Sequence, residues 1–263
     1  MNQNWDAEQY TDHFSFVHRY GDDVAGLIDM NGVESILDLG CGNGALTARF
    51  HDRGVSVTGM DASEEMLQIA RREHPEISFF CGDAASFHLE TPVDVVFSNA
   101  VFHWIEEKRQ RDMIRCVYKA LKDDGQFVFE MGGHGNNRLI HNALKESFQK
   151  RGLTYIMPFY FPTIGMYAQL LEENGFRVTF AQLFDRFTPL EGKDGLADWI
   201  RMFVNEPFES VADAVKEEII TETVFRLQPY LFKNGAWHAD YVRLRMKVEK
   251  HIENGGCHGY QTD

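Results

Sequence analysis

Basic residues are scarce in this chain, which has 26 lysines and arginines against 40 aspartates and glutamates and a formal net charge of −14 at pH 7. No run of lysine or arginine offers a compensating patch. An acidic surface repels phosphate backbones and anionic lipid headgroups. We therefore expect neither nucleic acid nor a membrane as a partner.

Long apolar runs and paired cysteines are also lacking. No apolar stretch approaches the roughly eighteen residues that a membrane span needs, and the first residues do not have the pattern of a signal peptide. The four cysteines show no CxxC spacing, and three of them, Cys41, Cys81 and Cys116, fall in expected core elements. This usage indicates free thiols in a reducing compartment. We expect a cytoplasmic protein without a metal site, as a monomer or a weak homodimer.

Short apolar runs alternate with amphipathic stretches through the first half of the chain. The expected strands are 35–40, 55–61, 77–83, 93–100 and 126–131, and the expected helices are 45–53, 63–74 and 106–122. Ser63 is a predicted N-cap, and Gly125 is expected just past the end of the third helix. Strands that are apolar on nearly every residue and separated by helices indicate a parallel sheet covered on both faces.

The flanking segments predict a single α/β domain with additions. Its expected parts are a helical lead-in (1–32), a core (33–131), late strands and helices (132–187 and 233–252), a helical cap insertion (188–232) and a flexible tail (253–263). Two late strands are predicted at 176–187 and 237–250. In the cap, Trp199, Met202 and Phe203 form an apolar stripe at helical spacing. Such a stripe favours core packing over a pocket wall.

The most informative stretch is "SILDLGCGNGAL", residues 35–46, in which Gly40, Gly42 and Gly44 follow a strand and precede a helix. Glycines permit positive φ and remove the Cβ atoms that would block a flat ligand. The turn lies at the carboxyl edge of the first strand, where open α/β sheets bind their ligands. With Ala45 the stretch also satisfies G-x-G-x-x-G/A, so a dinucleotide stays open at this point.

Three aspartates follow the ends of consecutive strands. Asp38 stands before the glycine turn, where a carboxylate suits an ammonium group better than a pyrophosphate. Asp61 ends the second strand and can accept two hydrogen bonds from a ribose diol, whereas Asp83 ends the third and can accept one from an adenine amino group. Together they outline a site for a cationic nucleoside that carries an amino acid.

The motifs "ESILDLGCGNGALT", "VTGMDASEEMLQIAR", "FFCGDA" and "VDVVFSNAVFHWI" resemble those of class I S-adenosylmethionine-dependent methyltransferases, and most of all the trans-aconitate methyltransferase-like small-molecule enzymes. The resemblance is close over residues 36–131. It implies a Rossmann-like, mostly parallel seven-stranded sheet of order 3-2-1-4-5-7-6, in which only strand 7 is antiparallel. Helices would cover both faces, and the cap would be an insertion over the substrate.

The resemblance also implies S-adenosyl-L-methionine as the cofactor and a set of residues that hold it. Near the methionine part these are Asp38, Gly40, Cys41, Gly42, Gly44 and, through its backbone carbonyl, Asn99. Near the ribose and adenine they are Asp61, Ala62, Met66, Asp83 and Ala84.

Candidate catalytic residues are His103, Tyr10 and His13, each as a base or as a group that orients the methyl acceptor. A carboxylate acceptor needs no base, whereas a phenol or enol does. For a polycarboxylate, Arg138, Arg186 and Arg201 are available, although each is equally typical of a solvated surface.

The sequence therefore favours a methyltransferase that moves a methyl group from S-adenosylmethionine to a small molecule, at a carboxylate or hydroxyl oxygen. Two alternatives stay open. One is an NAD-dependent oxidoreductase, and the other is a catalytically silent S-adenosylmethionine-binding protein.

Overall fold

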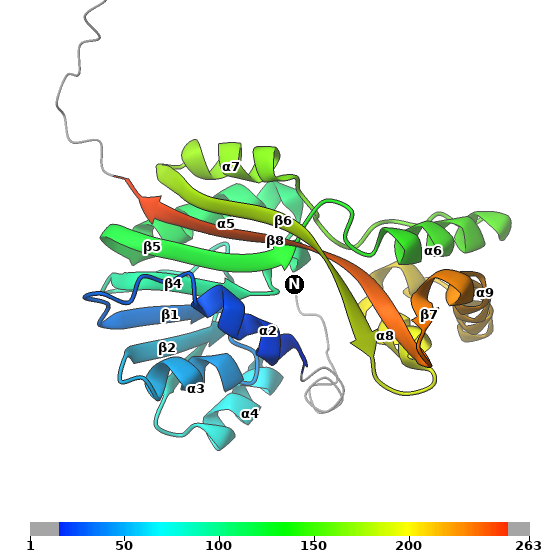
Figure 1. The fold of residues 1–263 in the computed structure, drawn as a ribbon, viewed down its shortest axis with the longest axis horizontal. Helices are drawn as coiled ribbons and strands as arrows, with labels where there is room; N and C mark the ends of the chain where they lie inside the picture. The colour runs from blue at the N-terminus through cyan, green and yellow to red at the C-terminus, as the bar shows by residue number, and fades with distance from the viewer. Residues whose placement is uncertain (1–15, 252–263) are drawn as a thin grey trace, which may run out of the picture.

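The structure, a computed structural model, describes residues 16–251, with side chains from residue 21 onward. Its main feature is one mixed sheet with the strand order β3-β2-β1-β4-β5-β8-β6, to which the two-residue strand β7 adds by pairing with β8 (Figure 1). The strands are β1 Ser35–Leu39, β2 Ser56–Asp61, β3 Ser78–Cys81, β4 Val93–Asn99, β5 Leu121–Gly132, β6 Phe176–Leu190, β7 Phe232–Lys233 and β8 Ala236–Lys250.

The predicted fold class and strand order are confirmed, because β8 occupies the place of the expected seventh strand. Strands β1 to β5 pair in parallel, whereas β8 runs antiparallel to both β5 and β6. The helices are α2 Phe16–Ala25, α3 Ala45–His51, α4 Glu64–Glu73, α5 Glu107–Ala120, α6 Arg138–Lys150, α7 Ile164–Glu172, α8 Gly195–Phe203 and α9 Asp213–Leu231, with the 3-10 helices η1 Phe102–Trp104 and η2 Glu206–Phe208.

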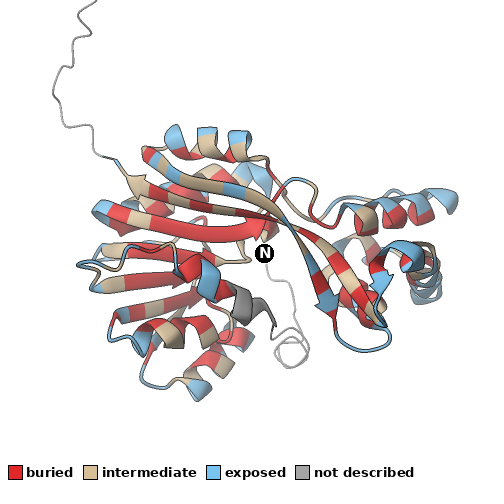
Figure 2. Cartoon of the chain, viewed as in Figure 1, coloured by how far each residue is buried: buried red, intermediate tan, exposed pale blue. Residues whose placement is uncertain are grey.

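Both faces of the central strands are buried, as their continuous apolar sequences predict. In β5, Phe127 and Phe129 pack on one face with residues of α5 and α7, whereas Val128 packs on the other face with residues of α2 and α3. All three side chains are fully buried. In Figure 2 the colour of buried residues covers most of this strand, whose exposed residues lie near its start. We call the sheet with these helices the core lobe.

The hairpin of β6 and β8 extends beyond the rest of the sheet and forms the base of a second lobe (Figure 1). Pairing of β5 with β8 ends at Gly132 and Arg243, but pairing of β6 with β8 continues to Leu190 and Trp237. The buried side chains of β8 are at even positions from Leu244 onward and at odd positions before it. Since neighbouring side chains point to opposite faces of a strand, the two halves of the hairpin bury opposite faces.

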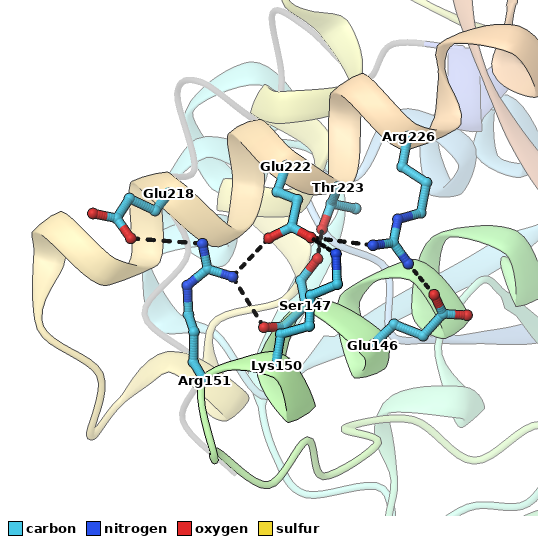
Figure 3. Close-up of polar contacts among 8 residues, drawn as sticks. All are labelled: Glu146, Ser147, Lys150, Arg151, Glu218, Glu222, Thr223 and Arg226. Atoms are coloured by element: carbon cyan, nitrogen blue, oxygen red, sulfur yellow. Dashed lines mark hydrogen bonds and ion pairs between the residues drawn. The ribbon is translucent and has the colours of Figure 1, made fainter.

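Helices α6, α8 and α9 cover the outer half of the hairpin, and we call this part the cap lobe. A set of ion pairs joins α6 to α9 (Figure 3). Glu222 accepts hydrogen bonds from Lys150 at 2.5 Å and Arg151 at 2.7 Å, and Arg226 pairs with both Glu222 and Glu146. Helix α6 follows β5 in the chain, and α9 lies between β6 and β8. These contacts therefore join two segments that are far apart in sequence.

Two expectations of detail need correction. The prediction that Gly125 lies just past the third helix is wrong, because α5 ends at Ala120 and Gly125 lies inside β5. A Cβ on Gly125 would be 2.8 Å from the carbonyl oxygen of Lys122, so this glycine serves a tight irregular start of the strand. Cys81, expected in the core, is exposed at the end of β3, whereas Cys41 is buried.

The predicted N-cap is confirmed, since the Ser63 side chain accepts a hydrogen bond from the backbone N–H of Met66. None of the helices between residues 16 and 251 is long and apolar enough to cross a membrane.

Candidate active site

A cavity of about 480 Å³ opens along the carboxyl edge of the parallel strands and continues beneath the cap lobe. Its wall includes most of the cofactor-binding residues predicted from the sequence, which come from the ends of β1 to β4 and from the first turn of α4. These are Gly40, Gly42, Asp61, Ala62, Met66, Asp83, Ala84 and Asn99. His103, just past the end of β4, lines the same cavity. The predicted residues Asp38, Cys41 and Gly44 lie behind this wall, and Tyr10 and His13 lie outside the described residues.

The glycine turn has the backbone that its sequence predicts. Gly40, Gly42 and Gly44 all have positive φ, of 81°, 57° and 80°. A Cβ on Gly40 would be 2.2 Å from the side chain of Val101, so only glycine fits there. A Cβ on Gly44 would meet Phe79 at 2.9 Å, which makes this residue a packing glycine. A Cβ on Gly42 would meet only the end of Met66, at 3.3 Å, so this backbone is open to the cavity.

Asp38 is buried beneath the turn, with 2% of its surface exposed. Its Oδ2 accepts a hydrogen bond from the Thr47 hydroxyl at 2.7 Å. Burial raises the pKa of Asp38 to about 7 despite this hydrogen bond. The carboxylate is therefore costly to ionise until a positive group comes near it.

Asp61, at the end of β2, joins the turn to the next helix. Its Oδ2 accepts the backbone N–H of Gly42 at 2.9 Å, and its Oδ1 accepts the N–H of Ser63 at 2.8 Å. Burial raises the pKa of Asp61, and these backbone donors counteract the effect. Each oxygen keeps a lone pair for a further donor, so a diol in the cavity could donate to both.

Asp83 has a partner that the sequence did not reveal. Arg109, in the first turn of α5, donates to Asp83 Oδ2 at 2.6 Å, and the backbone N–H of Ala85 donates to Oδ1 at 2.9 Å. Burial alone would raise the pKa of Asp83, but the hydrogen bond from Arg109 brings it below its ordinary value. Asp83 is thus held ionised at the cavity edge, and Arg109 itself lines the cavity.

His103 lies in η1, just past the end of β4, and is almost fully buried. The backbone N–H of Gly132 donates to His103 Nδ1 at 3.2 Å, so the neutral ring carries its proton at Nε2. Burial, and next the positive charge of Arg243, lowers the pKa of His103 well below its ordinary value. In this structure the ring is therefore neutral, and its Nδ1 is already engaged.

The wall beneath the cap lobe consists of residues that the sequence did not single out as ligands. They are Asn136, Asn137, Phe159, Phe161, Tyr241 and Arg243, together with Trp199 and Phe203 of the apolar stripe. Trp199 belongs to the core of the cap lobe as predicted and also reaches the cavity, where its Nε1 donates to the Tyr241 hydroxyl at 2.7 Å. Tyr241 and Arg243 belong to the late strand predicted at 237–250, but only the tertiary fold places them in a cavity.

The three arginines proposed from the sequence do not line the cavity. Arg138 and Arg201 are exposed, and Arg201 pairs with Asp198 and Glu217. Arg186 is partly buried and donates two hydrogen bonds, of 2.7 and 2.9 Å, to Glu130. Within residues 16–251, no group of three or more histidine, cysteine, aspartate and glutamate side chains could hold a metal ion.

Comparison with known proteins identifies the family of this chain. A family described as "Methyltransferase domain" matches residues 36–125. The chain is 31% identical to an uncharacterized methyltransferase of Schizosaccharomyces pombe, over 94% of this chain and 98% of that protein. It is 26% identical to a trans-aconitate 2-methyltransferase of Rhizobium etli, over 95% of this chain and 93% of that protein.

The fold is similar to the crystal structure of an S-adenosylmethionine-dependent methyltransferase from Mesorhizobium loti, with a TM-score of 0.52, 20% identity and coverage of 87% of this chain and 96% of that chain. The chain therefore belongs to the class I S-adenosylmethionine-dependent methyltransferases, as its motifs predicted.

Proposed function

We propose that this enzyme transfers the methyl group of S-adenosylmethionine to an oxygen of a small molecule. The observation that carries the proposal is the single cavity in which the open backbone of Gly42 and the carboxylates of Asp61 and Asp83 lie at one end and His103 lies toward the other. This arrangement supports a cofactor and an acceptor held side by side.

The residues present fit the cofactor. Asp61 offers acceptor lone pairs for the ribose hydroxyls, and Asp83 and Ala84 lie where the adenine edge would be recognised. The methionine part would lie over Gly40 and Gly42, with the carbonyl of Asn99 and the buried charge of Asp38 favouring its ammonium group. When bound, the cofactor supplies an activated methyl group on a positively charged sulfur.

The protein's contribution is then to position the acceptor and exclude water. His103 donates a hydrogen bond from Nε2 and, being neutral with Nδ1 engaged, does not remove a proton. We therefore favour a carboxylate over a hydroxyl as the acceptor oxygen, because a carboxylate is already ionised at neutral pH. The trans-aconitate activity of the Rhizobium etli relative supports an oxygen acceptor.

Different segments of the chain would bind the cofactor and cover the acceptor. We propose that residues 33–131 hold the cofactor and that the insertion at 188–232, which contains α8 and α9, covers the acceptor. Trp199 and Phe203 of α8 support this division because they line the cavity. The acidic net charge of −14 supports a small-molecule acceptor over nucleic acid.

The test is calorimetric titration of the full chain with S-adenosylhomocysteine, with NAD and NADH titrated in parallel. We expect micromolar binding of S-adenosylhomocysteine alone, lost in Asp61→Ala and kept in Asp52→Ala, which removes an exposed acid at the end of α3. Binding of NAD in its place would favour the oxidoreductase alternative. Binding of S-adenosylhomocysteine without methyl transfer to any acceptor would favour the silent binder.

A further inference from the structure

The loop that follows β5, residues 133–137, is held against β8 by a side chain in place of a strand. Pairing of the two strands ends at Gly132. Beyond it, the backbone N–H of Gly133 donates to the carbonyl of Val242 at 2.9 Å, and the N–H of Val242 donates to Oδ1 of Asn136 at 2.9 Å. The Asn136 amide therefore has one orientation, because a flipped amide would set its nitrogen against that N–H.

The nitrogen of this amide reaches the cavity. Asn136 is 3% exposed and lines the cavity wall. A Cβ on Gly132 would be 3.0 Å from Asn136 Nδ2 and 2.5 Å from Phe161, so the missing side chain makes room for the amide and the ring. Among the described residues Nδ2 has no hydrogen-bond partner, yet it is not one of the fully enclosed polar atoms that lack one. Nδ2 therefore keeps accessible surface, from which it can donate to a ligand.

His103 presents a second donor beside the same glycine. The backbone N–H of Gly132 donates to His103 Nδ1 at 3.2 Å, which leaves the proton of the neutral ring on Nε2. In residues 16–251 no acceptor binds Nε2, and this atom too is absent from the fully enclosed ones. The His103 ring lies 6.0 Å from that of Phe161, which shares the space beside Gly132 with the Asn136 amide. Gly132 therefore fixes two neutral donors, one through its N–H and one through its lack of a side chain.

Two donors whose own acceptor atoms are already used select a ligand oxygen with free lone pairs. A carboxylate offers such oxygens, whereas an ammonium group would meet N–H with N–H. Because both donors are neutral, they orient a carboxylate without supplying its counter-charge. The positively charged sulfur of the proposed cofactor would supply that charge in the same cavity.

The cations of the described wall are already engaged, so we expect only one carboxylate on the acceptor. No lysine lines this wall, and two arginines do. Arg109 donates to Asp83 at 2.6 Å. Arg243 has its guanidinium 4.4 Å from the centre of the Tyr241 ring and its Nε 3.8 Å from Glu130. A polycarboxylate would therefore bring charges that this wall does not match.

The rings around the two donors favour a flat molecule. Phe159 and Phe161 stack on each other at 5.4 Å with an interplanar angle of 19°, and Trp104 lies edge-on to Phe159 at 4.6 Å. All three line the cavity. Aromatic walls of this kind favour a planar ring through offset-stacked or edge-to-face contacts.

We propose that Asn136 determines the specificity for the acceptor, and that the acceptor is an aromatic monocarboxylate such as a benzoate or a cinnamate. Asn136 Nδ2 and His103 Nε2 donate to one carboxylate oxygen. The other oxygen forms the new bond to the methyl carbon while the carbon–sulfur bond breaks and leaves its electron pair on sulfur. The products are a methyl ester and S-adenosylhomocysteine, and no proton moves. This inference rests on the proposed function, because it names the acceptor of that reaction.

The experiment measures methyl ester formation by the full chain with S-adenosylmethionine, detected by mass spectrometry. The acceptors are benzoate, trans-cinnamate, octanoate as a flexible apolar acid, trans-aconitate as a polycarboxylate, and benzyl alcohol, which lacks an ionised oxygen. We expect benzoate or cinnamate to have a kcat/KM about tenfold or more above the values for octanoate and trans-aconitate. Benzyl alcohol should give no product.

Asn136→Asp tests the donor with little change of shape. Its carboxylate can still accept the N–H of Val242, but it replaces the amide donor with an acceptor that repels an anionic ligand. We expect the KM for the aromatic acid to rise about 10–100-fold. Asn205→Asp adds the same charge at an exposed position of the cap lobe and should leave KM unchanged. Calorimetry should show unchanged S-adenosylhomocysteine binding in both variants, which establishes that they are folded.

Three outcomes would overturn the inference. They are no methyl ester from either aromatic acid, a higher kcat/KM for trans-aconitate than for both of them, and an unchanged KM in Asn136→Asp. None of these touches the proposed function, which fails only if S-adenosylhomocysteine itself does not bind.

Discussion

The two ends of the cavity are built on different principles. At the cofactor end, the side chains come from the ends of adjacent parallel strands, and their carboxylates are tied to nearby backbone: Asp61 to Gly42 and Ser63, and Asp83 to Ala85. At the acceptor end, the side chains come from elements far apart in sequence, and Asn137 and His141 leave polar atoms unsatisfied.

This difference shows that one end of the cavity depends on local sequence and the other on the tertiary arrangement of distant segments. Parallel strands bring their carboxyl ends to one edge whatever their loops contain, so a cofactor site built there depends on local sequence. The acceptor end depends on how the hairpin of β6 and β8 leaves the sheet and on which helices cover it. A polar group left unsatisfied there costs stability.

The largest expected effect comes from adding one methyl group at the cofactor end. Gly40→Ala should lower the free energy of unfolding by about 2–5 kcal/mol, because a left-handed backbone is combined with a clash against Val101. Gly54→Ala is the matched control, since its φ is also 81° but a Cβ there meets nothing within 4 Å. It should lose only about 1–2 kcal/mol. Urea unfolding of both variants measures the difference, and equal losses would mean that the turn is not tightly packed.

Asp38→Asn should raise the free energy of unfolding at high pH while it weakens cofactor binding. Because the pKa of Asp38 is raised to about 7 in the folded chain, the folded state holds this proton more tightly than the unfolded state. Its contribution to stability is therefore full at low pH and is lost as the pH rises from about 4 to about 7. At pH 8 the asparagine variant should be more stable than the parent by up to about 4 kcal/mol.

The same variant should bind S-adenosylhomocysteine more weakly, because the ammonium group loses its buried counter-charge. In the parent protein the affinity should fall as the pH drops below 7. Thermal unfolding and calorimetry across pH 5–8 check both effects, with Asp52→Asn as an exposed control. A variant that is less stable than the parent at pH 8 would contradict the argument.

His103 tests whether the acceptor end supplies a donor or a base. His103→Phe should lower kcat/KM about 10–100-fold through loss of one hydrogen bond to the acceptor, whereas S-adenosylhomocysteine binding and the activity of the exposed-site variant His88→Phe should stay unchanged. Because the pKa of His103 lies well below its ordinary value, this residue should add no limb to the pH–rate profile of the parent between pH 6 and pH 9 at saturating S-adenosylmethionine. A limb of the pH–rate profile near 6.5 that disappears in His103→Phe would instead identify a base.

The core lobe could be predicted from the sequence because the signals that define it are local. The apolar runs, the glycine turn and the Ser63 cap each depend on residues a few positions apart, and the sheet order followed from the family resemblance. The misplacement of Gly125 has a local cause too, since α5 passes into β5 without a separate turn. Burial of Cys81 was inferred from an apolar strand end that lies at the exposed edge of the sheet.

The acceptor end could not be predicted because its contacts join distant segments. The state of His103 depends on Gly132, 29 residues away, and the position of Asn137 depends on Asp240. In β8 the buried side chains change from odd to even positions between Arg243 and Leu244, where the strand passes from one lobe to the other. An alternating sequence shows two faces but not which face each lobe covers.

The smallest expected effect concerns Arg109, a residue of α5 that holds Asp83 at the cofactor end. Its ion pair with Asp83 is 2.6 Å long, but both side chains are partly exposed, so solvent screens the pair and leaves about 0.2–1 kcal/mol. Arg109→Ala should therefore weaken S-adenosylhomocysteine binding only a few-fold, through a less fixed Asp83. Arg111 lies on the same helix as Arg109 and makes an equally short pair with Glu173, the C-cap residue of α7. Arg111→Ala is therefore the matched control and should leave binding unchanged. A loss as large as that of Asp61→Ala would show that the cofactor end, too, depends on a long-range contact, and the contrast between the two ends would then be weaker than the geometry indicates.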